Sequence, residues 1–178
     1  MKTKTYNVYE FDELTDEQKE MALDEYRFIN VEDSSWYEYQ SDWNAVKIEG
    51  FDLDRGQYCD IQFTTSAEDT ARYIVENHSK TCDTYKTSTQ FLKEMKVLEK
   101  QYIQADREYE KELEQNSQDN LLRIEGEMEE LRHEYEKQLS EDILVLLRND
   151  YDYLTSDESI IDTFKANEFL FTEKGKID

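Results

Sequence analysis

Three aspartates in the middle of the chain, Asp52, Asp54 and Asp60, are the residues best suited by type to bind a metal ion. Carboxylate oxygens are the ligands that hard divalent cations prefer. However, residues at i and i+2 of a strand lie on one face, and alternating acids are typical of a strand face exposed to water. No calcium-loop spacing and no nearby histidine accompany them. The sequence therefore predicts no metal site and no cofactor.

The two histidines, His78 and His133, are the other candidates for chemistry. His78 and Cys82 are four residues apart, which could suit a metal pair or a Cys–His nucleophile, but no further ligands follow. His133 lies beside an apolar helical seam, where a surface role is expected. The chain has no glycine-rich phosphate loop, no G-x-S-x-G and no H-E-x-x-H. We therefore expect no catalytic residues and a protein that is not an enzyme.

The composition is strongly acidic, with 44 Asp and Glu against 21 Lys and Arg and a formal net charge of −23. Such a surface repels DNA, RNA and anionic membranes and attracts basic surfaces, although high solubility alone would also explain it. The 13 Tyr and 8 Phe predict a real core. Two cysteines without C-x-x-C spacing fit a reducing cytosol. No apolar run approaches the ~18 residues of a membrane span.

Long helices must position most of this charge, because an apolar seam at steps of three and four runs through residues 91–151. Its members are Met95, Leu98, Tyr102, Ala105, Tyr109, Ile124, Met128, Leu131, Tyr135, Leu139, Ile143 and Leu146. Two arrangements fit this pattern: an antiparallel hairpin joined near residues 115–120, or one continuous helix that pairs with another chain. The joint is rich in Asn, Asp and Ser, which favour turns and caps, so a hairpin is preferred.

The segments on either side of the arm are predicted to form short strands and capped helices. Strands are expected over residues 5–11 and 168–172, and a β-hairpin over 51–63 with its turn at Arg55-Gly56. Helices are expected from Thr15 to about Asn30, near 35–46, over 67–78 and after Thr155, three of them opened by a capping box. The residues expected to be buried in these helices are Met21, Ala22, Tyr26, Ile29, Trp36, Tyr39, Trp43, Val46, Ala71, Ile74, Val75, Ile160, Ile161 and Phe164.

Together these elements predict an α+β fold. A small antiparallel sheet would form from both chain ends and the middle hairpin, with helices packed on it and a long helical hairpin, a coiled-coil arm, inserted. The expected domains are an α+β domain at 1–87, the arm at 88–151, and a helix and strand at 152–178 that complete the α+β domain.

Three segments carry a resemblance to a known group of proteins. They are YNVYEFDEL near the start, FDLDRGQYC in the middle and YLTSDESIIDTFKANEFLFTEKGKI at the end. They resemble small acidic proteins of phages and prophages in Gram-positive bacteria, which are often labelled antitoxins of toxin–antitoxin systems. The resemblance touches both ends and the hairpin, whereas the arm is matched only by its helical character. It implies the host bacterial cytoplasm as the location and makes counter-defence a plausible role.

The charge and the resemblance together lead to a functional hypothesis of the anti-CRISPR type. The protein would inhibit a host RNA-guided DNA nuclease by binding its basic nucleic-acid groove, in the manner of a DNA mimic. The expected partner is a basic protein surface, not nucleic acid itself or a membrane, and the protein would be a monomer or a homodimer through the arm. The candidate partner-binding residues are Asp106, Glu108, Glu110, Glu112, Glu114, Glu125, Glu127, Glu129, Glu130, Glu134 and Glu136.

Two alternatives remain open at this point. An antitoxin that neutralises a cognate toxin would also bind a basic partner and would have a toxin gene beside its own. A self-associating coiled-coil protein of the phage would instead pair its apolar seam between chains. An ordinary solvated helix face would explain the acidic residues of the arm equally well, with Arg107, Lys111, Arg132 and Lys137 partly neutralising it.

Overall fold

The computed structural model describes residues 7–31, 45–112 and 115–178, and it has an α+β fold. Two compact units make up the chain: residues 1–39 with 148–178, and residues 40–147. Segments expected together in a domain at 1–87 therefore contribute to separate units. The prediction of one small sheet is wrong. Within the described residues, the strands near the chain ends form one two-stranded sheet and the middle hairpin forms another. None of the helices in the described ranges combines the length and the apolar character that a membrane crossing demands.

In the first unit, strand β1 (Tyr9–Glu10) pairs antiparallel with β4 (Leu170–Phe171). The strands are shorter than expected, since β1 passes directly into the 3₁₀ turn η1 (Phe11–Glu13). Helices α1 (Asp16–Glu25) and α6 (Asp157–Ala166) complete the unit. Aromatic rings fill its core: Phe164 lies 4.9 Å from Phe171 and 5.4 Å from Phe11 between ring centroids.

The capping box that opens α1 is confirmed. The Gln18 amide donates to Thr15 Oγ1 (3.4 Å), and the Thr15 amide donates to Gln18 Oε1 (2.9 Å). Ala22 is fully buried as expected, but Met21 is 46% exposed. The reason is that Met21 lies ~100° around the helix from Ala22, so the two side chains do not share a face. Helix α1 also ends at Glu25 rather than near Asn30.

Two details of the C-terminal segment differ from expectation by one residue. The N-cap of α6 is Ser156, whose Oγ accepts the Ser159 amide (3.2 Å), while the Thr155 hydroxyl donates back to the Tyr151 carbonyl. The sequence also favours Asn167 for the left-handed position after α6, because Asn tolerates that conformation, but the structure has Glu168 there (φ 52°) and Asn167 at φ −96°. The expected turn at Gly175 is present with φ 69°, and a Cβ there would lie 3.0 Å from the Ala22 nitrogen.

The second unit contains the β-hairpin, one short helix and most of the helical arm. Strand β2 (Val46–Asp52) pairs antiparallel with β3 (Tyr58–Phe63), with a register shift between Ile48 and Gly50. The hairpin is confirmed, but it starts at Val46, which the sequence had placed on a helix. The other residues of that expected helix, 35–44, lie outside the described residues. Phe51 is 38% exposed, although the shift places it opposite Cys59, which is 5% exposed, and so on the same face of the hairpin.

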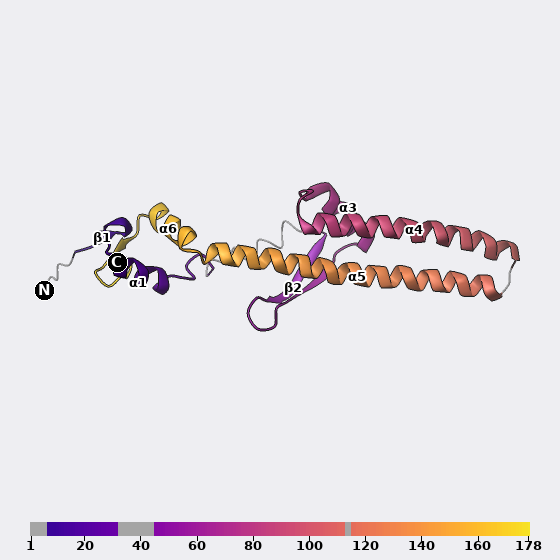
Figure 1. Cartoon of the computed structure of the whole chain (residues 1–178), viewed down its shortest axis with the longest axis horizontal. Coiled ribbons are helices and arrows are strands. Elements are labelled where there is room, and N and C mark those ends of the chain that lie inside the picture. The colour runs from indigo at the N-terminus through magenta and orange to yellow at the C-terminus, as the bar shows by residue number, and fades with distance from the viewer. Residues whose placement is uncertain (1–6, 32–44, 113–114) are drawn as a thin grey trace. The chain divides into compact units, whose positions relative to one another are not determined.

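Helix α3 (Ala67–Asn77) begins at the N-cap Ser66 and buries Ala71 and Ile74 as expected, whereas Val75 is half-buried. The arm follows as α4 (Asp83–Glu112) and α5 (Gln115–Leu154), which lie side by side in Figure 1. The polar segment 79–87 suggests either a loop or a frayed lead into the arm, and helix α4 starts within it, at Asp83. Every expected seam residue of the arm is buried or half-buried.

The hairpin reading of the arm is confirmed by contacts between residues far apart in sequence. Tyr102 Oη donates to Glu125 (3.1 Å), and the Phe91 and Tyr135 rings stack with centroids 4.2 Å apart. Ala105, Leu121 and Ile124 form a buried cluster near the far end. A continuous helix is therefore excluded. The joint was misplaced, because residues 115–120 belong to α5 and the first helix already ends at Glu112.

Candidate protein-binding surface on the helical arm

Five of the eleven candidate residues were assigned to the first helix of the arm. Glu108 and Glu110 are exposed on α4, and Asp106 is half-buried beside the seam. Glu112 is the last residue of α4, and Glu114 lies outside the described residues. The exposed Gln104 side chain donates to Glu108 (3.0 Å).

The other six candidates lie within twelve residues of α5. Glu125, Glu129, Glu130 and Glu134 are exposed, and Glu127 and Glu136 are half-buried. Glu127 pairs with Arg123, and Glu129 with Arg132 (3.2 Å). Among the described residues, no ion pair or hydrogen bond engages the carboxylates of Glu130, Glu134 and Glu136. Helix α5 thus brings together acidic groups that remain available to a partner.

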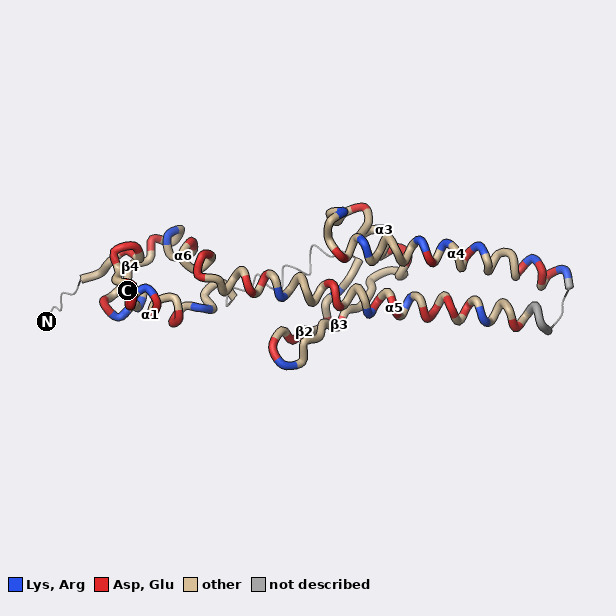
Figure 2. The backbone as a smooth tube through the Cα atoms, viewed as in Figure 1, with Lys and Arg blue, Asp and Glu red and all other residues tan. Residues whose placement is uncertain are grey.

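Charge is distributed unequally between the two helices of the arm, as Figure 2 shows by the red and blue segments along each tube. Helix α4 contains seven acidic and six basic residues, whereas α5 contains eleven acidic and four basic ones. From the sequence, five candidate residues were expected on the first helix and six on the second, and this difference in charge was not predicted. The charged residues are visible in the sequence, but they can be counted for each helix only when the helix boundaries are known.

An ion pair fixes α5 to α3 next to this surface. Arg132 Nη2 lies 2.8 Å from Glu68 Oε1, and Arg132 also contacts Glu129. The Glu68 side chain is only 15% exposed, and its hydrogen bond raises the pKa of Arg132. Arg132 is thus occupied inside the unit, which leaves less of its charge to neutralise the outer carboxylates. No sequence pattern had linked these two residues, which are 64 positions apart.

Asp52, one of the three aspartates considered for metal binding, stabilises the turn of the hairpin. The Asp52 carboxylate accepts backbone amides from Asp54 (2.8 Å), Arg55 (3.2 Å) and Gly56 (2.9 Å). These bonds lower the pKa of Asp52, and the bond from Gly56 contributes most to that shift. Within residues 7–31, 45–112 and 115–178, no three His, Cys, Asp or Glu side chains are arranged to hold a metal ion.

His78 and Cys82 come together around a buried threonine rather than around a substrate site. His78 Nδ1 lies 2.9 Å and Cys82 Sγ 3.2 Å from Thr84 Oγ1, and Cys82 also donates to the Ser79 carbonyl. Thr84 is 1% exposed. Burial lowers the pKa of His78, which favours the neutral ring at physiological pH. The contacts are those of a helix junction that satisfies its own polar groups.

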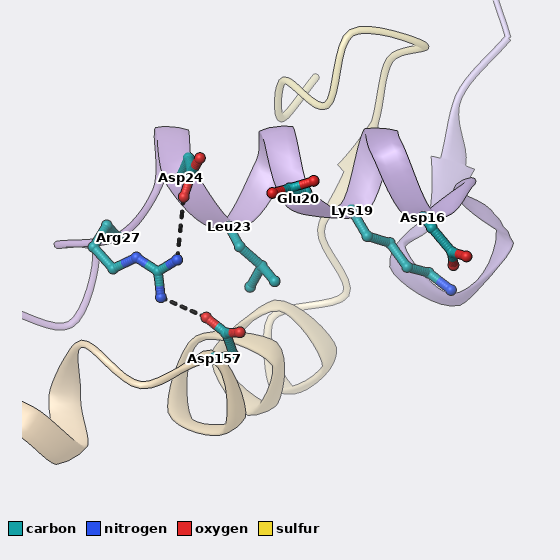
Figure 3. Close-up of a pocket in the computed structure, with 7 residues that line it drawn as sticks. All are labelled: Asp16, Lys19, Glu20, Leu23, Asp24, Arg27 and Asp157. Atoms are coloured by element: carbon teal, nitrogen blue, oxygen red, sulfur yellow. Dashed lines mark hydrogen bonds and ion pairs between the residues drawn. The ribbon is translucent and has the colours of Figure 1, made fainter.

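An open groove of about 370 Å³ lies between α1 and α6 (Figure 3). Arg27 bridges its walls by pairing with Asp24 (3.2 Å) and Asp157. Lys19 lies over the Phe11 ring, with Nζ 5.9 Å from the centroid. The cations that line the groove are therefore engaged in holding the first unit together.

Comparisons of the chain with protein-family models, with curated protein sequences and with solved structures found no match.

Proposed function

We propose that this protein is a phage-encoded inhibitor that binds a basic nucleic-acid-binding surface of a host RNA-guided DNA nuclease. The observation that carries the proposal is the charge of α5, with eleven acidic residues against four basic ones along the whole helix. Its place of action would be the cytoplasm of the host bacterium. The partner would be protein, with no direct contact to nucleic acid or membrane.

The density of charge on α5 supports competition with a phosphate backbone. Six carboxylates between Glu125 and Glu136 cover ~17 Å of helix at ~1.5 Å per residue, or about one every 3 Å. Duplex DNA carries one negative charge per ~1.7 Å of its axis. The two densities agree within about twofold when all sides of each rod are counted. At ~100° per residue, Glu127, Glu130 and Glu134 share one flank of α5 and the other three carboxylates lie on the opposite flank, so α5 can offer carboxylates to a basic channel that surrounds it.

The packing of the arm supports the same role, because the carboxylates are held by a folded framework. Tyr135 and Leu139 anchor the inner side of α5 and are 3% and 0% exposed. Arg132 secures it to α3 through Glu68. A prepositioned row of charges loses little conformational entropy on binding.

The test is DNA cleavage by a panel of purified RNA-guided nucleases, with the protein added before or after the target DNA. Competition for the nucleic-acid channel predicts a block when the protein is added first and little effect when it is added last. A block in both orders would contradict mimicry, because it would mean inhibition that leaves DNA bound. No block across the panel would refute the proposed function.

A matched pair of variants tests the role of α5. Glu130→Lys with Glu134→Lys and Glu94→Lys with Glu99→Lys change the net charge equally, and all four side chains are exposed on the arm. We expect the α5 variant to lose at least tenfold in inhibition and the α4 variant to lose much less. Equal losses would mean that only net charge matters. Circular dichroism and thermal unfolding check that both variants fold.

A further inference from the structure

The face of α4 that points away from α5 carries a row of cations that the proposed function does not use. Its members are Lys93, Lys96, Lys100, Arg107 and Lys111, all of them exposed. Within the part of the chain that the structure describes, none of these five side chains forms an ion pair or a hydrogen bond. We call this row the basic stripe of α4.

The helical period makes the stripe a single surface. Its residues follow each other at steps of three, four, seven and four, and the seam residues from Met95 to Tyr109 repeat at steps of three and four. At ~100° per residue, the stripe is centred about 180° from the seam. Val97 and Ile103 flank it and are 53% and 50% exposed. Cations with exposed apolar side chains beside them are suited to docking an acidic helix.

A second copy of this chain is the partner that the structure itself supplies. Glu127, Glu130 and Glu134 of α5 have the i, i+3, i+7 spacing of Lys93, Lys96 and Lys100 on α4, and both sets span ~10.5 Å. We call these three glutamates the acidic row of α5. A nucleic-acid partner is disfavoured, because a chain with a net charge of −23 repels a polyanion.

We infer that the acidic row of α5 in one copy docks against the basic stripe of α4 in another. The stripe faces away from α5 within its own hairpin, so the two surfaces cannot meet inside one chain. The same geometry makes the contact heterologous, since a docked pair of copies still has one unoccupied stripe and one unoccupied row. Within the row, Glu127 also pairs with Arg123 of its own helix, whereas Glu130 and Glu134 form no ion pair among the described residues. Association would therefore continue beyond a dimer as the concentration rises. This contact uses charged outer faces and leaves the apolar seam within each chain.

The test is sedimentation velocity of the full chain over a range of concentrations at fixed, moderate ionic strength. Two variants with identical i, i+4 spacing are compared with wild type: Lys96→Glu with Lys100→Glu, and Glu130→Lys with Glu134→Lys. We expect the mean mass of the wild type to rise with concentration and each variant alone to remain a monomer. An equimolar mixture of the two variants should associate again, because the reversed stripe of one matches the reversed row of the other.

Net charge alone predicts a different pattern. The Glu→Lys variant has two fewer negative and two more positive charges, so its net charge is four less negative than that of the wild type. General repulsion between its copies is therefore weaker, and it should associate more than the wild type. Association of that variant at or above the wild-type level would overturn the inference. So would a wild type that stays monomeric at every concentration, or a mixture of variants that does not associate. None of these measurements involves a nuclease, so they are independent of the proposed inhibitory function.

Discussion

Tyr135 joins three elements of the second unit through one side chain. Its ring stacks on Phe91 of α4 and lies 5.6 Å from the Phe63 ring of β3, while its hydroxyl hydrogen-bonds Ser88 (2.9 Å). Burial raises its pKa to about 12. The side chain is 3% exposed and Ser88 is 0% exposed. A polar pair this deeply buried depends on both of its members.

Replacing Tyr135 with Phe should therefore lower the free energy of unfolding by about 1–2 kcal/mol, because the ring contacts remain but the buried Ser88 hydroxyl loses its partner. Tyr102→Phe is the matched control. It removes an equivalent hydroxyl whose partner, Glu125, is exposed to water, and we expect a change within about 0.5 kcal/mol. Urea unfolding followed by far-UV circular dichroism measures both. Equal losses of unfolding free energy in the two variants would show that the buried bond to Ser88 stabilises the fold no more than the exposed bond to Glu125.

At the level of single residues, the sequence predicted which residues of the arm lie in the buried seam far better than which residues of other elements they contact. Tyr135 was recognised as a seam residue from its spacing alone. Its contact with Phe63 was not, because a helical period says nothing about a strand 72 positions earlier. Val46 was assigned to a helix because it continued a 3-4-3 spacing, although Val46 and Ile48 also begin the alternation of a strand. Tertiary pairing with β3 decided between the two periods.

At the level of elements, the joint of the arm shows how packing overrides local preference. Asn, Asp and Ser at residues 116–120 favour turns, yet they form the first turns of α5. Leu121 and Ile124 directly follow and are buried against Ala105 of α4. Each unfavourable residue costs at most ~0.7 kcal/mol in a helix, whereas burying a Leu or Ile contributes ~1.5–3 kcal/mol. The candidate acidic surface depended on these boundaries, which explains why its bias toward α5 was missed.

The start of α6 provides a prediction at this scale. Ser156 accepts the Ser159 amide at the N-terminus of the helix, and α6 supplies Ile160 and Phe164, both almost fully buried, to the core of the first unit. Ser156→Ala should lower the free energy of unfolding of this unit by about 1 kcal/mol, since an orphan amide of the helix loses its acceptor. Ser156→Asp should retain most of the stability, because aspartate caps equally well. Thermal unfolding of the three proteins measures the effect, and an Asp variant no better than the Ala variant would argue against the cap.

At the level of the whole molecule, two electrostatic effects oppose each other. Surface ion pairs such as Arg72–Asp69 (2.6 Å) and Lys86–Asp83 (2.7 Å) stabilise the fold, but an exposed pair contributes only ~0–1 kcal/mol. With 44 acidic and 21 basic side chains, more than half of the carboxylates have no cation to pair with. Their mutual repulsion acts against the compact state. The balance therefore favours repulsion as the larger effect.

Added sodium chloride should accordingly raise the melting temperature. The screening length shortens from ~10 Å at 0.1 M to ~3 Å at 1 M salt, which weakens the repulsion among carboxylates more than the attraction in the few exposed pairs. The variant Glu130→Gln with Glu134→Gln should melt higher than wild type at low salt, and the difference should shrink as salt is added. Lys96→Gln with Lys100→Gln alters the same arm at the same i, i+4 spacing and should do the opposite. Differential scanning calorimetry of the three proteins isolates this charge effect from general effects of salt on water. A melting temperature that falls with salt would instead mean that attraction between opposite charges outweighs the repulsion among the acidic ones.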